Sequence, residues 1–120
     1  MTQDSVSKYV TVRLAERFAG SLLTRDQGKI VRDDLRFEID SGALVTIEFE
    51  GVSELTPSFA DEALGRLLLE IGPDRFKKQV VLRSATLDIR RLVNKVLAHR
   101  EKERKDRSNK DKADSRKRAS

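Results

Sequence analysis

The chain of 120 residues contains no cysteine and only one histidine, His99. Without cysteine there can be no disulfide and no thiolate nucleophile, and one histidine cannot build a zinc site of the usual kind. The sequence also has no EF-hand-like acidic loop and no glycine-rich phosphate loop. It therefore predicts no metal ligands, no cofactor and no catalytic residues, and we expect a protein that is not an enzyme.

Long apolar runs are missing as well. No stretch of 18 apolar residues is present, so we expect no transmembrane helix. Residues 1–8 are polar and lack the apolar region of a signal peptide. These features favour a cytoplasmic protein without a membrane role.

The net charge of +5 is unevenly distributed. Residues 100–118 hold ten Lys/Arg and five Asp/Glu, which accounts for the whole excess. No core-forming side chain follows residue 106 or so. We therefore predict a flexible N-terminus at residues 1–8, a folded domain at 9–99, and a basic, mostly disordered tail at 100–120 into which the last helix could extend.

Strand and helix patterns alternate along the domain. Apolar alternation predicts strands at 9–14, 43–49 and 79–83, with 43–49 central because Val45, Ile47 and Phe49 share one face. Helices are expected at 25–37, at 58–71 and from Thr86 onward. Phe18, Leu22 and Leu23 suggest an irregular stretch or a short edge strand. The order predicts an α/β fold with a small mixed sheet of about four strands and three helices.

Helical spacing indicates which side chains face the core. In the first helix, with Thr24 as its N-cap, these are Ile30, Val31, Leu35 and Phe37. Gly28 weakens that helix by about 1 kcal/mol relative to alanine, but it would permit close packing against a neighbour. The last helix carries an apolar stripe made of Ile89, Leu92, Val93, Val96 and Leu97.

The segment from Phe49 to Glu62 reads as the end of a strand, a tight loop and the start of a helix. Ser58 lies where the helix should begin, and Ser-Phe-Ala-Asp fits a capping box between Ser58 and Asp61. Free backbone N–H groups at such a start can also meet anions or partner proteins. Three roles for Ser58 stay open: a structural cap, a phosphosite, or a partner contact.

Several short motifs resemble a known family. They are Thr24-Arg25, Ile47-Glu48-Phe49-Glu50-Gly51-Val52 and, most specifically, Ser58-Phe59-Ala60-Asp61-Glu62. The chain resembles, over residues 9–98, the STAS-like family of uncharacterised bacterial domains. That family is related to the sulfate-transporter and anti-sigma-factor-antagonist (STAS) fold.

The resemblance implies a regulatory protein-interaction module. In the antagonist group a GHKL-type ATPase, which is also an anti-sigma factor, phosphorylates a serine at the helix start, and Ser58 corresponds to it. The neighbours differ from that group, because Thr56 and Pro57 precede Ser58 and Phe59 follows it. An ATPase or kinase-type partner is expected to bind residues 51–62. The implied partner-binding residues are Gly51, Ser58, Phe59, Asp61 and Glu62, with Ser58 as a candidate phosphosite.

The neighbours of Ser58 leave alternatives open. A phosphate there adds about two negative charges, which Asp61 and Glu62 would repel, so a cap or a contact is favoured. The two acids could form an acidic contact surface or an acid–base pair. Phe59 is either a core residue or an interface anchor. Arg25 either pairs with an acid such as Glu48 or Glu50 or is solvated.

The tail suggests a second class of function. Its cations could contact nucleic acid phosphates. They form two clusters, Lys102, Arg104, Lys105 and Arg107, and Arg116, Lys117 and Arg118. Interleaved acids dilute this charge, and without aromatic residues the tail cannot stack on bases. The alternatives are a solvated extension or a nucleic-acid-associated accessory protein; the sequence predicts no oligomeric state.

Overall fold

The computed structural model describes residues 8–119, with the side chains of residues 8–108. The predicted flexible N-terminus lies outside this range except for Lys8. The elements are β1 Tyr9–Arg13, η1 Leu14–Glu16, η2 Phe18–Gly20, β2 Ser21–Leu22, α1 Arg25–Asp40, β3 Leu44–Glu48, β4 Glu54–Leu55, α2 Pro57–Ala60, η3 Asp61–Gly65, α3 Arg66–Ile71, α4 Pro73–Gln79, β5 Val80–Arg83 and α5 Leu87–Ala119.

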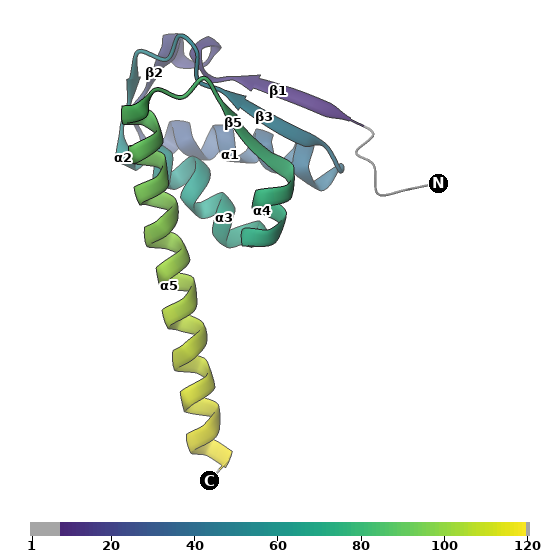
Figure 1. Cartoon of the computed structure of the whole chain (residues 1–120), viewed down its shortest axis with the longest axis vertical. Helices are drawn as coiled ribbons and strands as arrows, with labels where there is room; N and C mark the ends of the chain where they lie inside the picture. Colours follow the sequence, from purple (N-terminus) through teal and green to yellow (C-terminus); the bar gives the residue numbers. More distant parts are fainter. Residues whose placement is uncertain (1–7, 120) are drawn as a thin grey trace.

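The strands form two parallel sheets (Figure 1). The larger has the order β1-β3-β5, with Val10 opposite Val45 and Val45 opposite Val80. The smaller pairs β2 with β4. The predicted α/β class is confirmed, but a mixed sheet of about four strands is wrong. Because helices lie within the crossovers that join neighbouring strands, those strands run in the same direction.

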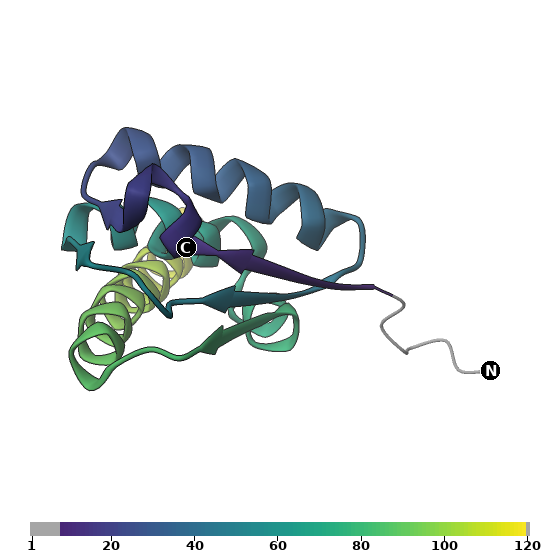
Figure 2. The same ribbon diagram turned by 90° about the horizontal axis from the view of Figure 1, so that it is seen from above.

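The helices cover one face of the larger sheet (Figure 2). The core lies between these helices and the inward side chains of the strands. Val45 and Ile47 of β3 are fully buried, which confirms the predicted central strand. On the opposite face Tyr9, Thr11 and Arg13 of β1 are exposed. One side of this sheet therefore meets solvent.

Helix α1 begins as predicted and buries a different face. The Thr24 hydroxyl accepts a hydrogen bond from Gln27 N at 3.1 Å, and the Gln27 side chain accepts one from Thr24 N at 3.0 Å. Val31 and Leu35 are buried as expected, but Ile30 is 50% exposed and Phe37 is 71% exposed. Their predicted core positions are wrong, because the buried stripe runs instead through Gly28, Val31, Arg32, Leu35 and Ile39.

The second predicted helix is continuous from Pro57 to Ile71, but its middle, η3, is a π-helical turn. It ends at Gly72-Pro73 as predicted. A further helix, α4, was not predicted. Pro73 starts it at the first helical position, where proline is favoured because its missing N–H has no helical partner. With α2, η3 and α3 counted as one, and apart from the short 3-10 turns η1 and η2, the chain has four helices within the described residues, not three.

Helix α5 starts at the predicted cap, since the Thr86 hydroxyl accepts a hydrogen bond from Ile89 N at 3.2 Å. Val93 is fully buried, and Ile89, Leu92 and Leu97 pack against the core. The helix then projects away from the domain to Ala119 (Figure 1). Residues 100–120 were expected to be mostly disordered. Since the projecting turns have no apolar stripe to bury, we expect their helicity to be marginal in solution.

Candidate functional site

The helix start that follows β4 is capped by Thr56, and the predicted Ser58 cap is wrong. The Thr56 hydroxyl accepts a hydrogen bond from Phe59 N at 3.1 Å and donates one to Leu23 O at 2.6 Å. Pro57 occupies the first helical position, so the helix begins one residue earlier than predicted. Ser58 is exposed in the first turn. Its hydroxyl is therefore not committed to capping.

Phe59 belongs to the core. It is 1% exposed and is one of the largest fully buried side chains of the domain. The alternative that it anchors an interface is therefore wrong, because it presents almost no surface. Gly51 is exposed in the loop, with a φ of +86° that side-chain-bearing residues rarely adopt. Of the five predicted contact residues, Gly51 and Ser58 remain openly accessible.

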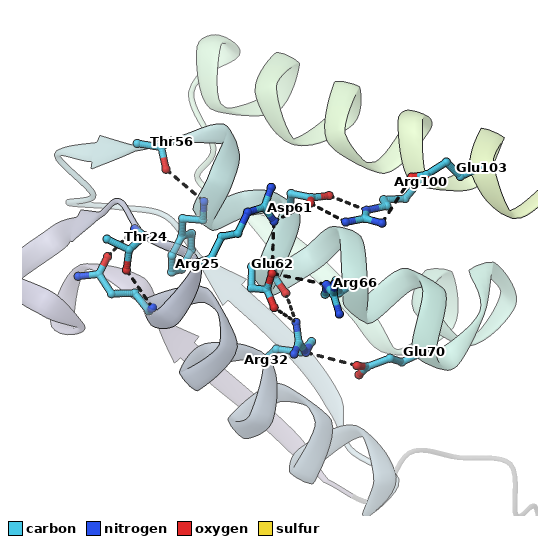
Figure 3. A network of polar contacts seen from close by, with 12 residues as sticks. Thr24, Arg25, Arg32, Thr56, Asp61, Glu62, Arg66, Glu70, Arg100 and Glu103 are labelled. Atoms are coloured by element: carbon cyan, nitrogen blue, oxygen red, sulfur yellow. Dashed lines mark hydrogen bonds and ion pairs between the residues drawn. The ribbon is translucent and has the colours of Figure 1, made fainter.

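Asp61 and Glu62 are held in an ionic network that joins three helices (Figure 3). Both Asp61 oxygens accept hydrogen bonds from Arg100 of α5, at 2.7 Å each, and Arg25 of α1 donates at 2.9 Å. Glu62 accepts hydrogen bonds from Arg25 at 3.2 Å and from Arg32 at 2.8 Å. These carboxylates are therefore largely neutralised.

Arg25 pairs with Asp61 and Glu62, so its suggested pairing with Glu48 or Glu50 is wrong. Glu48 instead accepts hydrogen bonds from Arg83 at 2.6 Å and from Glu50 N at 3.0 Å. The Ser84 hydroxyl, followed by these two donors, lowers the pKa of Glu48 to about 2. Glu48 therefore stabilises the turn after β3 as an anion.

Arg32 was not identified from the sequence. The Arg32 side chain is buried. It donates hydrogen bonds to the backbone oxygen of Glu62, at 2.6 Å, and to the Glu62 carboxylate, at 2.8 Å. A signal was present, because Arg32 lies four residues after Gly28 and seven before Ile39, on the buried stripe of α1. A charged residue on such a stripe indicates a buried partner.

Two glycines let the helices approach closely around this network. A Cβ on Gly28 of α1 would lie 2.9 Å from the backbone oxygen of Phe59, so the predicted close packing at Gly28 is confirmed. A Cβ on Gly65 would lie 2.6 Å from an Asp61 oxygen and 3.1 Å from the Arg100 side chain. The π-helical turn from Asp61 to Gly65 thus lies where α1 and α5 both converge.

The anchoring of α5 by Asp61 predicts a dependence of stability on pH. Arg100, and then Arg25, lower the pKa of Asp61 from 3.8 to about 2. Because the folded-state pKa is lower, this contribution is complete above the unfolded pKa and is lost as pH falls through about 2. We expect Asp61→Asn to lower the free energy of unfolding by about 2 kcal/mol at pH 7.

Denaturant unfolding, monitored by circular dichroism at several pH values, measures the difference in free energy of unfolding between the unaltered chain and Asp61→Asn. The deficit of Asp61→Asn should shrink as the pH is lowered from 5 toward 2. Asp33→Asn, at an exposed position of α1, is the matched control and should change stability by less than about 0.5 kcal/mol. A deficit that stays constant over this pH range would show that the ion pair does not carry the effect.

A groove of about 580 Å³ opens between the start of α2 and the side of α5. Pro57 and Ser58 line it from the loop side, and Arg25 lines it from α1. Asp61 of η3 also lines it. The rest of its lining comes from α5: Leu92, Lys95, Val96, His99, Arg100 and Glu103. These α5 residues were not predicted as part of the site, since the stripe of Leu92 and Val96 reads from the sequence as core alone.

The groove combines partly buried apolar side chains with exposed cationic ones. Leu92 and Val96 are partly buried, whereas Arg25 and Lys95 are exposed. Asp61 and Glu103 add acidic groups to the lining. Such a surface can receive a protein segment that presents apolar side chains beside an acidic group. Within the described residues no group of three His, Cys, Asp or Glu side chains could hold a metal ion.

The predicted nucleic-acid contacts lie on the projecting part of α5. Lys102, Arg104, Lys105 and Arg107 are exposed, and Arg104 pairs with Glu101 at 3.0 Å. The side chains of Arg116, Lys117 and Arg118 lie outside the described residues. In the described part of the chain no helix combines the length and apolar character needed to cross a bilayer.

The comparisons with known proteins identify the family. Searches of curated proteins and of solved structures found no match. A family described as a STAS-like domain of unknown function matches residues 27–90. The match runs from the first turn of α1 to the first turn of α5, so it includes the loop, Ser58 and the network acids but not the α5 side of the groove. The chain belongs to the family of STAS-like domains of unknown function.

Proposed function

We propose that this chain is a non-enzymatic regulatory module of bacterial cytoplasm that binds a GHKL-type ATPase or kinase partner. The partner contacts the loop from Gly51 to Ser58 and the adjacent groove beside α5. One observation carries this proposal: an exposed loop and helix start are mounted on a rigid, ion-paired scaffold, beside a groove of about 580 Å³. Ser53 N and Thr56 N donate hydrogen bonds to Gly20 O and Leu22 O, both at 3.1 Å, so the loop is held before a partner arrives and loses little conformational freedom when it binds.

The state of the acids supports binding over catalysis. A general base works best when its pKa lies near the operating pH. The pKa of Asp61 is held at about 2, and both its oxygens already accept hydrogen bonds from Arg100. Glu62 is likewise engaged by Arg25 and Arg32. We therefore interpret the two acids as the support of the surface, and not as an acid–base pair or an open acidic patch.

The same contacts revise the expectation about a phosphate on Ser58. Repulsion by Asp61 and Glu62 was expected to disfavour it, but guanidinium groups offset both charges. Ser58 is exposed, and the cations Arg25 and Lys95 line the same groove, together with Asp61 and Glu103. An accessible hydroxyl beside cations is compatible with modification by a kinase-type partner.

A binding measurement tests the main proposal. A purified GHKL-type ATPase from the same genome is titrated with the full chain, with ATP present, in a calorimeter. We expect Ser58→Tyr to weaken binding at least tenfold, because the bulky side chain fills an exposed position of the contact surface without touching the core. Lys77→Tyr on α4, also at an exposed position, should leave the affinity unchanged. Equal affinities of the two variants would remove the proposed surface.

The alternative is that the cations of α5 make the chain a nucleic-acid-associated accessory protein. Its supporting observation is the projection of α5 away from the domain (Figure 1), with Lys102, Lys105 and Arg107 exposed. The same preparations decide between the two functions. If the ATPase does not bind, and a DNA duplex binds with an affinity that falls steeply with salt and is lost on removing residues 100–120, the alternative is favoured. Intact mass after incubation with ATP and the ATPase separates a modified Ser58 from an unmodified contact.

A further inference from the structure

Strand β1 is an open edge of the larger sheet. Within the described residues it pairs only with β3. Leu44 N donates to Lys8 O at 3.0 Å, which shows that the peptide groups of Lys8 face β3. In a parallel ladder the facing residues alternate, so those of Val10 and Val12 also face β3. The peptide groups of Tyr9, Thr11 and Arg13 therefore point away from the sheet, toward its free edge.

The edge is bordered by a groove that has room for an added chain. This groove, of about 410 Å³, is lined by Val10–Arg13 along the strand and by Asp34, Phe37 and Glu38 of α1. Two ion pairs connect α1 to the chain on either side of β1. Lys8, just before the strand, pairs with Glu38 at 2.9 Å, and Arg17, after the strand, pairs with Asp34 at 2.7 Å. Phe37 is 71% exposed and Tyr9 is 75% exposed. Large aromatic side chains beside an unpaired strand edge favour a covering partner.

We propose that the partner is a second copy of this chain, whose β1 pairs antiparallel with the first across a two-fold axis at Thr11. A two-fold axis perpendicular to the sheet reverses the strand, so the contact is antiparallel and closed. Thr11 then faces Thr11 of the second copy, and Tyr9 faces Arg13 of the second copy. Tyr9, Thr11 and Arg13 all present unpaired peptide groups to that edge. In this register each N–H of one copy therefore lies opposite a C=O of the other.

The side chains in this register are complementary to one another. Tyr9 and Arg13 bring an aromatic ring beside a guanidinium, a favourable cross-strand pair, and the β-branched Thr11 meets its own copy. The charged residues of the groove are Arg13, Arg17, Glu16, Asp34 and Glu38, and Lys8 at its rim pairs with Glu38. These three cations balance the three anions, so two copies meet without net repulsion. This surface shares no lining residue with the groove beside α5. The dimer is thus independent of the proposed ATPase site.

The absence of native cysteine allows a direct test of the register. Directly opposed, hydrogen-bonded residues have Cα atoms about 5.5 Å apart, within the range of a disulfide. Under mild oxidation, Thr11→Cys should form at least tenfold more disulfide-linked dimer on a non-reducing gel than Val81→Cys, on the same exposed sheet face but on β5. A mixture of Tyr9→Cys and Arg13→Cys chains should give a mixed disulfide. Equal crosslinking of Thr11→Cys and Val81→Cys would overturn the proposal.

Solution mass provides a second, non-covalent measurement. The unaltered chain at 100 µM should scatter light as a particle of twice the 13.6 kDa chain mass. Thr11→Pro removes the outward N–H and leaves the β1–β3 ladder intact, so it should give one chain mass, whereas Thr11→Val should keep the dimer. Circular dichroism checks the fold of both variants. One chain mass for the unaltered protein at this concentration would contradict the proposal and leave the edge to a strand of a different protein.

Discussion

Phe59→Ala is expected to lower the free energy of unfolding by about 4 kcal/mol, one of the two largest effects that we predict. Phe59 is 1% exposed and lies among Leu14, Ile47 and Leu64. Removing the ring would leave a cavity lined by apolar side chains, which water does not fill favourably. The lost burial and the remaining cavity both oppose folding. Urea unfolding, monitored by circular dichroism, measures the change.

The control for this change is a large-to-small substitution at an exposed apolar position. Leu87→Ala, at a side chain that is 60% exposed, should alter stability by less than about 0.5 kcal/mol. Phe59→Leu should cost less than Phe59→Ala, because more of the volume stays filled. Similar small effects for Phe59→Ala and Leu87→Ala would contradict the buried position of the ring.

This result bears on how the partner surface can be tested. A Phe59→Ala variant that loses binding has lost part of its fold, so its failure says nothing about a contact. Asp61→Ala has the same weakness, because it releases the anchor of α5 by Arg100. Ser58→Tyr avoids both problems, since Ser58 is exposed and makes none of the network contacts.

The second large effect is expected at Gly28. Replacing a glycine in a helix by alanine normally stabilises by about 1 kcal/mol, but here we expect Gly28→Ala to destabilise by about 2–3 kcal/mol. The new Cβ would lie 2.8 Å from the Glu62 Cβ, 2.9 Å from Phe59 O and 3.1 Å from Ala63 N. Two of these atoms are backbone atoms of the neighbouring helix, so α1 itself would have to move. Thermal or urea unfolding measures whether Gly28→Ala raises or lowers the free energy of unfolding.

The neighbouring residue supplies the control. Lys29 is exposed, and Lys29→Ala should change stability by less than about 0.5 kcal/mol. A stabilised Gly28→Ala would mean that the helices are farther apart than the structure shows. If Gly28→Ala displaces α1 as expected, the contacts of Arg25 and Arg32 with Glu62 should be partly lost, because both arginines extend from this helix to Glu62.

Local patterns were sufficient where one short-range signal acted alone. The alternation in residues 43–49 predicted the central strand, and Thr24 and Thr86 were recognised as caps because capping depends on residues only three positions apart. The Gly72-Pro73 pair ended the second helix as expected. The Ser-Phe-Ala-Asp-Glu motif and its flanking strand pointed to the family that the match to residues 27–90 confirms.

Patterns failed where two signals competed at one position. Thr56 and Ser58 are both good caps, and Pro57 between them decides in favour of Thr56 by taking the first helical position. In α1, Ile30 and Phe37 suited a buried stripe as well as Gly28 and Arg32 did. The stripe was decided by contact with the second helix, where Gly28 allows close approach and Arg32 reaches Glu62.

The sequence by itself determined the α/β class, the main strands, the family and the absence of disulfide chemistry, because each depends on composition or on residues close along the chain. Only the tertiary structure decided how the segment from Gly51 to Glu62 is held in place and which of its side chains are exposed. Arg25, Asp61 and Arg100 are 36 and 39 residues apart along the chain, yet they form one ionic cluster. Ion pairing between such groups depends on their distance in space, which cannot be predicted from any periodicity in the sequence.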